Sequence, residues 1–269
     1  MEGANVYLSR LTIDVGSDAT RERPGRIWLR NLYHVHQRLC MAFPSEDRKS
    51  RDEHFLEPFN PEDFGQKQVR VKREAGSGFL FRVDPGPGAR AIILVQSAVE
   101  PDWDYAFHNA GYLLAAPAET KQFDVSFTAG QHLRFRLVAN PTRRLSKHSR
   151  ERDGEPVQEK WIGRRVPVPY DQLLDWLAVW RFHPDDSPGF SPHKDRTSVQ
   201  PGYVYVNKKR DGRAHRLFSV RYEGLLEVTD PEKFRTTLIR GIGPGKAFGF
   251  GLLSVAPCRA PRSSGNRPA

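Results

Sequence analysis

The residues best suited to chemistry lie close together near the start of the chain, as Tyr33, His34 and His36. A histidine side chain has an ordinary pKa of about 6.5, so it can accept and return a proton near neutral pH. On a helix, His34 and His36 would point about 200° apart and could not bind one metal ion together. Tyr33 and His36, three residues apart, would share a face. The spacing therefore excludes a shared metal site and leaves acid–base chemistry at His36, with Tyr33 on the same face, as a hypothesis; a packed or surface histidine more often gives this pattern.

A second candidate site lies at residues 241–251, which contain five glycines and Lys246. Glycine admits positive φ and close approach, and the backbone N–H groups of such a loop can form an anion-binding concavity. Gly243, Gly245 and Lys246 are therefore candidate phosphate contacts, and a tight structural turn is the alternative. Nucleotide-binding glycine loops follow a strand and open a helix, whereas here a predicted helix precedes the loop and a strand follows it. We therefore expect no nucleotide cofactor.

Positive charge is concentrated in the second half of the chain. Residues 1–120 carry 15 basic and 17 acidic side chains, whereas residues 121–269 carry 27 basic and 15 acidic ones, within a formal net charge of +10. This asymmetry is typical of a protein that binds a polyanion, with nucleic acid as the first candidate and an anionic membrane as the second.

Two groups of basic residues are candidate contacts to that polyanion, and each could instead be a solvated surface. One group surrounds an Asp-Gly hairpin turn, and the other opens a basic stretch over residues 143–165. A duplex of RNA is recognised mainly through its shape and backbone, so binding by such groups should depend on salt. The residues concerned are Lys208, Lys209, Arg210 and Arg213 at the turn, and Arg143 and Arg144 in the stretch.

Together these features fit cleavage of RNA without a metal, because RNA carries its own nucleophile. A base removes the proton of the 2′-OH, that oxygen attacks the adjacent phosphorus, and the 5′-oxygen leaves. The products would be a 2′,3′-cyclic phosphate and a 5′-hydroxyl. A nearby lysine or arginine could stabilise the charge that develops in the transition state.

The chain lacks signs of a membrane or secreted protein. No run of eighteen apolar residues is present, and the amino terminus lacks the apolar core of a signal peptide. Its two cysteines, Cys40 and Cys258, make neither a disulfide framework nor a metal site. We therefore expect a cytoplasmic protein with no membrane association, no metal and no cofactor.

The elements that must position these residues follow a β-α-β-β-α-β order twice. The pattern predicts an α+β protein of two tandem ferredoxin-like (RRM-like) domains, at residues 1–120 and 121–257, with a disordered tail at 258–269. A weakly periodic, charged excursion separates the first helix from the sheet over residues 45–78. The predicted strands are residues 5–14, 79–83, 91–98 and 121–127, then 131–139, 203–206, 217–228 and 252–255; the predicted helices are 27–43, 102–114, 171–180 and 230–240.

Five stretches, taken in order, resemble one known family. They are residues 6–11 (Val-Tyr-Leu-Ser-Arg-Leu), 31–37 (Asn-Leu-Tyr-His-Val-His-Gln), 95–103 (Val-Gln-Ser-x-x-Glu-Pro-Asp-Trp), 133–141 (Leu-Arg-Phe-Arg-Leu-x-Ala-Asn-Pro) and 241–257 (Gly-Ile-Gly-Pro-Gly-Lys-Ala-x-Gly-x-Gly-Leu-Leu-Ser-x-Ala-Pro). On these residues the chain resembles the CasE (Cse3-type) family, the CRISPR-associated endoribonucleases of the type I-E Cascade complex.

The resemblance implies a role for several of the residues named above. It implies that His36 is catalytic with Tyr33 as its helper, and that the basic hairpin grips a CRISPR repeat stem-loop near the scissile phosphate. It also implies that the protein stays on the 3′ hairpin of the mature guide RNA, with the other Cascade subunits as partners. The alternative is a non-catalytic RNA-hairpin-binding subunit in which His36 is structural.

Overall fold

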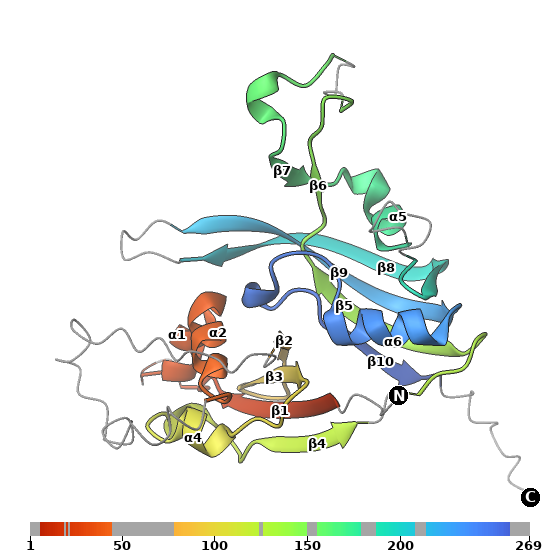
Figure 1. Cartoon of the computed structure of the whole chain (residues 1–269). Coiled ribbons are helices and arrows are strands. Elements are labelled where there is room, and N and C mark those ends of the chain that lie inside the picture. The colour runs from red at the N-terminus through yellow and green to blue at the C-terminus, as the bar shows by residue number, and fades with distance from the viewer. Residues whose placement is uncertain are drawn as a thin grey trace, which may run out of the picture.

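The computed structural model describes residues 6–18, 20, 22–44, 78–123, 126–149, 155–178, 187–207 and 214–258. The chain forms two four-stranded antiparallel sheets, each packed against helices (Figure 1). The predicted α+β class with two tandem ferredoxin-like units is confirmed. The predicted excursion at 45–78 and the predicted tail lie almost wholly outside the described residues.

The first sheet has the strand order β2-β3-β1-β4, as a ferredoxin-like unit requires. Alternate side chains of β1 are buried, and Leu11 and Ile13 pack in one core with Val35 and Leu39 of α2. The elements are β1 (Val6–Asp14), α1 (Pro24–Leu29), α2 (Leu32–Cys40), β2 (Phe79–Pro85), β3 (Arg90–Ser97), α4 (Trp103–Phe107), η3 (Gly111–Leu113) and β4 (Glu119–Phe123).

The second sheet repeats this topology with the order β10-β5-β9-β8. Its core face is covered by α5 and α6, and Tyr222 of β9 is fully buried there with its hydroxyl donating to the carbonyl of Leu173 at 3.0 Å. Burial raises the pKa of Tyr222. The elements are β5 (His132–Ala139), β6 (Thr142–Arg144), η4 (Glu159–Trp161), β7 (Arg165–Pro167), η5 (Tyr170–Gln172), α5 (Leu173–Ala178), β8 (Phe190–Val206), β9 (His215–Val228), α6 (Pro231–Arg240), η7 (Lys246–Phe248) and β10 (Leu253–Pro257).

The prediction of a single first helix at residues 27–43 is wrong, because the chain forms two helices in this region, α1 and α2. Asn31 has an extended backbone with φ −120° and ψ 96°, so the helical path stops before it. Its side chain then accepts the backbone N–H of Tyr33 and caps the start of α2. Asparagine is among the preferred residues at this position, since its oxygen satisfies an N–H group that has no partner within the helix.

β8 is the largest difference from the sequence prediction. The pattern predicts a strand only at residues 203–206, whereas β8 covers Phe190–Val206 and pairs with β9 along most of its length. Its sequence includes Pro192, Pro201 and Gly202, which are unusual in strands. β8 tolerates them because it lies at the edge of the sheet, and a bulge between Pro192 and Thr197 absorbs a shift in register.

The remaining differences concern the ends of elements. The predicted helix at 102–114 is shortened to α4 followed by η3, and the helix predicted at 171–180 is described only as η5 and α5. β4 begins at Glu119, so the predicted domain boundary at residue 120 falls inside a strand of the first sheet. We propose that the boundary between the two units follows β4. None of the helices in the described part of the chain is long and apolar enough to cross a membrane.

Candidate active site and nucleic-acid interface

α2 holds both predicted catalytic residues in the first unit. Val35 and Leu39 are fully buried and fix one face of the helix on the core. On the same helix, Tyr33 and His36 are half-buried and lie three residues apart, whereas His34 is exposed. The predicted sharing of a face by Tyr33 and His36, with His34 pointing elsewhere, agrees with this burial.

His36 lies against aromatic side chains of β2. Its ring centroid is 5.3 Å from that of Phe79 and 6.2 Å from that of Phe81. One turn along α2, the Sγ of Cys40 lies 3.6 Å from Nε2 of His36. These contacts pack the imidazole on several sides, and the residue as a whole is half-buried. A proton-transferring group must lie within hydrogen-bond reach of the proton that it moves.

The glycine loop at residues 241–251 packs directly beside α2 (Figure 1). The ring of Tyr33 lies 6.3 Å from that of Phe248 in η7, and both belong to a small apolar cluster with Val206 and Phe250. A β-carbon at Gly249 would lie 3.3 Å from the ring of Phe81. The structure therefore brings the two motifs that the sequence analysis singled out, far apart in the chain, to one place.

Each predicted glycine of the loop also has a structural reason for being glycine. Gly243 and Gly245 have φ angles of +79° and +81°, which favour glycine. A β-carbon would lie 3.1 Å from Trp176 at Gly243 and 2.8 Å from Phe250 at Gly245. The exposed side chain of Lys246 donates to the carbonyl of Arg240, at the end of α6. The tight-turn interpretation thus accounts for the glycines, and their contact with RNA stays a prediction.

The four predicted basic residues of the hairpin, Lys208, Lys209, Arg210 and Arg213, lie outside the described residues. The base of the hairpin is described, however, and it is fastened to α2. Asn31 donates from Nδ2 to the carbonyl of Asn207 at 2.9 Å, and its Oδ1 accepts the backbone N–H of Asn207 at 3.3 Å. This link between the two units places the start of α2 beside Asn207, the residue that immediately precedes the basic turn.

Arg143 and Arg144 lie in a different part of the molecule from His36. They belong to β6, which pairs with β7 in an arm that projects from the second sheet, away from the first unit (Figure 1). Arg144 is exposed and donates from Nε to the carbonyl of Gly163 at 3.1 Å. Further along the arm, the guanidinium of Arg164 lies 4.4 Å from the ring centroid of the exposed Trp161. Cations and an aromatic ring on one surface suit contact with a nucleic acid.

Two residues that hold α2 in position were not predicted from the sequence. Asn31 is one, and a helix-capping asparagine before an apolar periodic stretch is a signal that could have identified it. The other is Arg38, whose Nη1 donates to the carbonyl of Ala106 at 3.1 Å and to Oδ1 of Asn109 at 2.9 Å. Burial lowers the pKa of Arg38, and nearby Tyr112 opposes that shift. Nothing in the local sequence pairs Arg38 with those partners.

Comparison with known proteins gives consistent matches. A family profile described as "CRISPR associated protein" matches residues 6–257. The CRISPR-associated endoribonuclease Cse3 of Thermus thermophilus is 36% identical over 200 residues, which cover 70% of this chain and 84% of the relative. The CRISPR system Cascade subunit CasE of Escherichia coli is 26% identical over 254 residues, covering 94% of this chain and all of the relative.

Two solved structures of RNA complexes are also similar. One is the CRISPR endoribonuclease Cse3 bound to a 19-nucleotide RNA, with 28% identity, a TM-score of 0.65 and coverage of 94% of this chain and 100% of the other. The second is Thermus thermophilus Cse3 bound to an RNA representing a pre-cleavage complex, with 27% identity, a TM-score of 0.63 and the same coverage.

The family profile spans nearly all of the described chain, so this chain belongs to the family of CRISPR-associated proteins. Within that family it resembles Cse3 and CasE in sequence over both units. The resemblance inferred from the five sequence stretches is therefore confirmed.

Proposed function

We propose that the protein is a metal-independent endoribonuclease that cleaves precursor CRISPR RNA at the repeat stem-loop. The observation that carries this proposal is the position of Tyr33 and His36, on a capped helix that contacts both the glycine loop and the base of the basic hairpin. The naming of relatives as endoribonucleases, one of them in a pre-cleavage RNA complex, supports it.

In the proposed reaction the RNA supplies the nucleophile and the protein moves the protons. The 2′-oxygen loses its proton and attacks the phosphorus, and the bond to the 5′-oxygen breaks as that oxygen gains a proton. His36 acts as the proton-transferring group and Tyr33 helps to position the reacting atoms. Nearby basic side chains stabilise the additional negative charge on the phosphate. The products are a 2′,3′-cyclic phosphate and a 5′-hydroxyl.

The proposed RNA surface includes three groups of residues. The glycine loop contributes Gly243, Gly245 and Lys246, and the hairpin contributes Lys208, Lys209, Arg210 and Arg213. Arg143 and Arg144 on the projecting arm would contact a more distant part of the RNA. After cleavage the protein stays on the 3′ hairpin as a Cascade subunit in the cytoplasm; the name of the CasE relative supports the assembly role.

The test is cleavage of an end-labelled repeat hairpin in excess EDTA, with His36→Ala compared with His34→Ala. His34 is a matched control, because it lies on the same helix but is exposed. We expect one cut that leaves a cyclic phosphate, a loss of at least about 100-fold in His36→Ala and little change in His34→Ala. RNA affinity should stay within about twofold in both variants.

Two outcomes would count against the proposal. Full cleavage by His36→Ala would remove His36 from the reaction. Tight binding without any cleavage by the unaltered protein would favour a non-catalytic subunit that caps the hairpin. The contacts of His36 with Phe79 and Cys40 would then be those of a structural histidine.

A second prediction concerns the basic hairpin. Changing Lys208 and Lys209 together to glutamate should weaken RNA binding steeply at low salt and flatten the dependence of affinity on salt, because fewer counterions are released on binding. Filter binding over a series of salt concentrations measures both effects. An unchanged salt dependence would remove the hairpin from the interface.

A further inference from the structure

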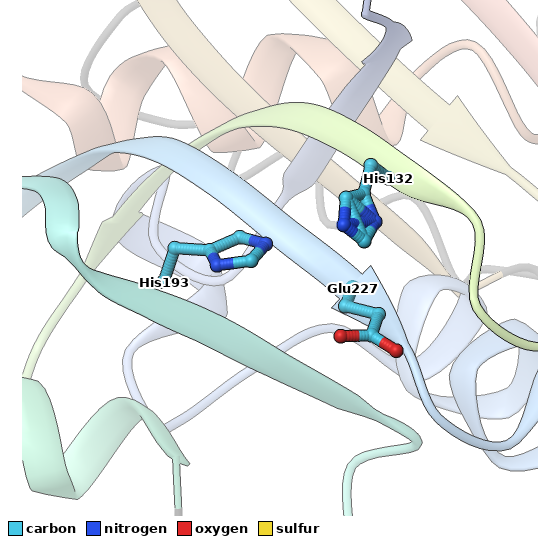
Figure 2. Close-up of side chains that lie close together, drawn as sticks. All are labelled: His132, His193 and Glu227. Carbon is cyan, nitrogen blue, oxygen red and sulfur yellow. The ribbon is translucent and has the colours of Figure 1, made fainter.

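Three side chains that could bind a metal ion gather at one end of the second sheet, on three different strands. They are His132 of β5, His193 of β8 and Glu227 of β9, and their ligand atoms all lie within 4.8 Å of one another (Figure 2). His132 and Glu227 are direct partners in the pairing of β5 with β9. Their neighbours Leu133 and Leu226 are buried in the core, so His132 and Glu227 project from the opposite face of the sheet.

The bulge in β8 brings the third residue to the other two. The register of β8 against β9 shifts between Pro192 and Thr197, and His193 lies within this irregular segment. The hydroxyl of Thr197 donates to the carbonyl of His193 at 2.8 Å and so fixes the bulge. A bulge at a strand edge is a common way of turning a side chain toward a site.

The ring nitrogens of the two histidines are in positions compatible with metal binding. Nδ1 of His132 lies 3.2 Å from the carbonyl of Gly130, an arrangement in which Nδ1 donates and Nε2 keeps its lone pair. Histidines that bind metals commonly donate their second ring nitrogen in this way. Nε2 of His193 is buried and has no hydrogen-bond partner among the described residues. A buried nitrogen without a partner is costly, and a metal ion would satisfy it.

We propose that His132, His193 and Glu227 form a binding site for a divalent transition metal ion, with Zn²⁺ as the ion it fits best. Two imidazole nitrogens and one carboxylate oxygen suit zinc, whereas Mg²⁺ and Ca²⁺ prefer oxygen ligands alone. Ligand atoms on one tetrahedral zinc ion are about 3.4 Å apart. Rotations of these three side chains would bring their ligand atoms from within 4.8 Å of one another to that separation. The fourth position would be taken by water.

The site lies far from the candidate active site. Glu227 is near the end of β9, and the opposite end of that strand, at His215, adjoins the basic hairpin. Glu227 is twelve residue steps along the strand from His215, about 40 Å at the usual rise per residue. The ion would therefore tie β5, β8 and β9 together at one end of the sheet and take no part in RNA cleavage.

The experiment is a titration of the untagged, full-length protein, first freed of metal with EDTA and dialysed, with ZnCl₂ by calorimetry and with Co²⁺ by visible absorption. We expect one equivalent to bind, and the intense visible bands of four-coordinate Co²⁺ to appear. His132→Ala, His193→Ala and the nearly isosteric Glu227→Gln should each lose this binding step. Zn²⁺ should raise Tm in the unaltered protein and not in Glu227→Gln.

Two control variants separate this site from other histidines. His215→Ala removes an exposed histidine at the far end of β9, and His36→Ala removes the histidine beside Cys40. Both should bind zinc as the unaltered protein does. Binding that is lost in His36→Ala and kept in Glu227→Gln would overturn the proposal, as would the absence of saturable binding by the unaltered protein. Cleavage of RNA in EDTA is measured separately, so failure of one proposal leaves the other intact.

Discussion

Asn31 makes three hydrogen bonds through one side chain. Its Oδ1 accepts the backbone N–H groups of Tyr33 at 3.2 Å and Asn207 at 3.3 Å, and its Nδ2 donates to the carbonyl of Asn207 at 2.9 Å. The first bond caps α2, and the other two connect α2 to the strand that leads into the basic hairpin. One residue thus sets both the start of the candidate catalytic helix and its position relative to the second unit.

The two roles of Asn31 can be separated by substitution. Asn31→Ala removes the cap and both bonds to Asn207, and should lower the free energy of unfolding by about 2 kcal/mol. Asn31→Asp keeps an oxygen that can cap the helix but loses the donor to the carbonyl of Asn207, so it should cost about half as much. Urea denaturation measures the stability of both variants.

Cleavage of the repeat hairpin checks whether the link to Asn207 matters for the site. Asn31→Asp should cleave more slowly than the unaltered protein, because the helix is still capped but is held less firmly against the hairpin base. An Asn31→Asp protein with unaltered stability and cleavage rate would show that the bonds to Asn207 contribute little.

At this scale the sequence points to candidate reactive residues more readily than to the residues that support them. Tyr33 and His36 can be proposed as candidates from their types and spacing, since both belong to one turn of one helix. The pairing of Asn31 with Asn207 cannot be predicted from the sequence, because those residues are adjacent only after the two units have come together. The sequence does not predict the proximity of His132, His193 and Glu227 for the same reason, since it depends on strand register and on a bulge.

Among the elements, the glycine loop has the strictest conformational requirement. η7 is flanked by Gly245 and Gly249, both in the left-handed region with φ angles of +81° and +75°. The loop is tied at its ends, because Ile242 donates to the carbonyl of Gly251 at 2.9 Å and Gly251 donates to that of Val138 at 2.8 Å. Two left-handed glycines and these bonds place Phe248 against Tyr33.

A substitution in this loop should therefore affect both stability and the site. Gly245→Ala places a side chain in the left-handed region, at a cost of about 1–2 kcal/mol, and sets its β-carbon 2.8 Å from the ring of Phe250. Gly88→Ala is the matched control, because Gly88 has a φ of +63° and a β-carbon there would have nothing within 4 Å. Thermal unfolding should show a larger loss for Gly245→Ala.

Cleavage should fall in Gly245→Ala and not in Gly88→Ala, since only the first displaces η7 from Tyr33. Equal losses of stability in the two variants would mean that backbone strain, rather than the contact with Phe250, determines the cost. An unaffected cleavage rate in Gly245→Ala would mean that the loop is not part of the active site.

The prediction of whole elements succeeds where hydrophobic periodicity is strong. β1, β5 and α6 are found close to their predicted positions, because alternating or helical patterns of buried residues define them. β8 is mostly missed, because many of its side chains face solvent and its prolines oppose a strand assignment. Pairing with β9 decides the conformation of β8, and that information lies elsewhere in the chain.

For the whole molecule, the contact between the two units includes a buried arginine. Arg82 of β2 is 3% exposed and pairs with Asp84 through bonds of 2.8–3.0 Å. Its Nη1 also reaches into the second unit, to the carbonyls of Arg136 and Leu252 and to the hydroxyl of Ser254. The side chain of Gln96 makes a second such link, donating to the carbonyl of Leu238 at 2.9 Å.

Replacing Arg82 should lower the free energy of unfolding considerably, and the physical cause of that loss can be tested. Arg82→Met introduces an apolar side chain of similar length and leaves the carboxylate of Asp84 buried; among the described residues, Arg136 at 3.8 Å is the other cation that pairs with it. Loss of one partner of a buried ion pair costs about 3–5 kcal/mol, and we expect the lower end of that range because Arg136 stays close. Urea denaturation followed by tryptophan fluorescence measures the loss.

The double variant Arg82→Met/Asp84→Asn separates the charge from the contacts between the units. If the buried carboxylate causes most of the cost, the double variant should recover most of the stability lost in Arg82→Met. If the lost bonds to Arg136, Leu252 and Ser254 dominate instead, the double variant should stay as unstable as the single one, and the two units should unfold in separate transitions. That second result would make Arg82 the residue that joins the two units, and RNA cleavage should then fall with it, because Tyr33 and the glycine loop meet only when the units are docked.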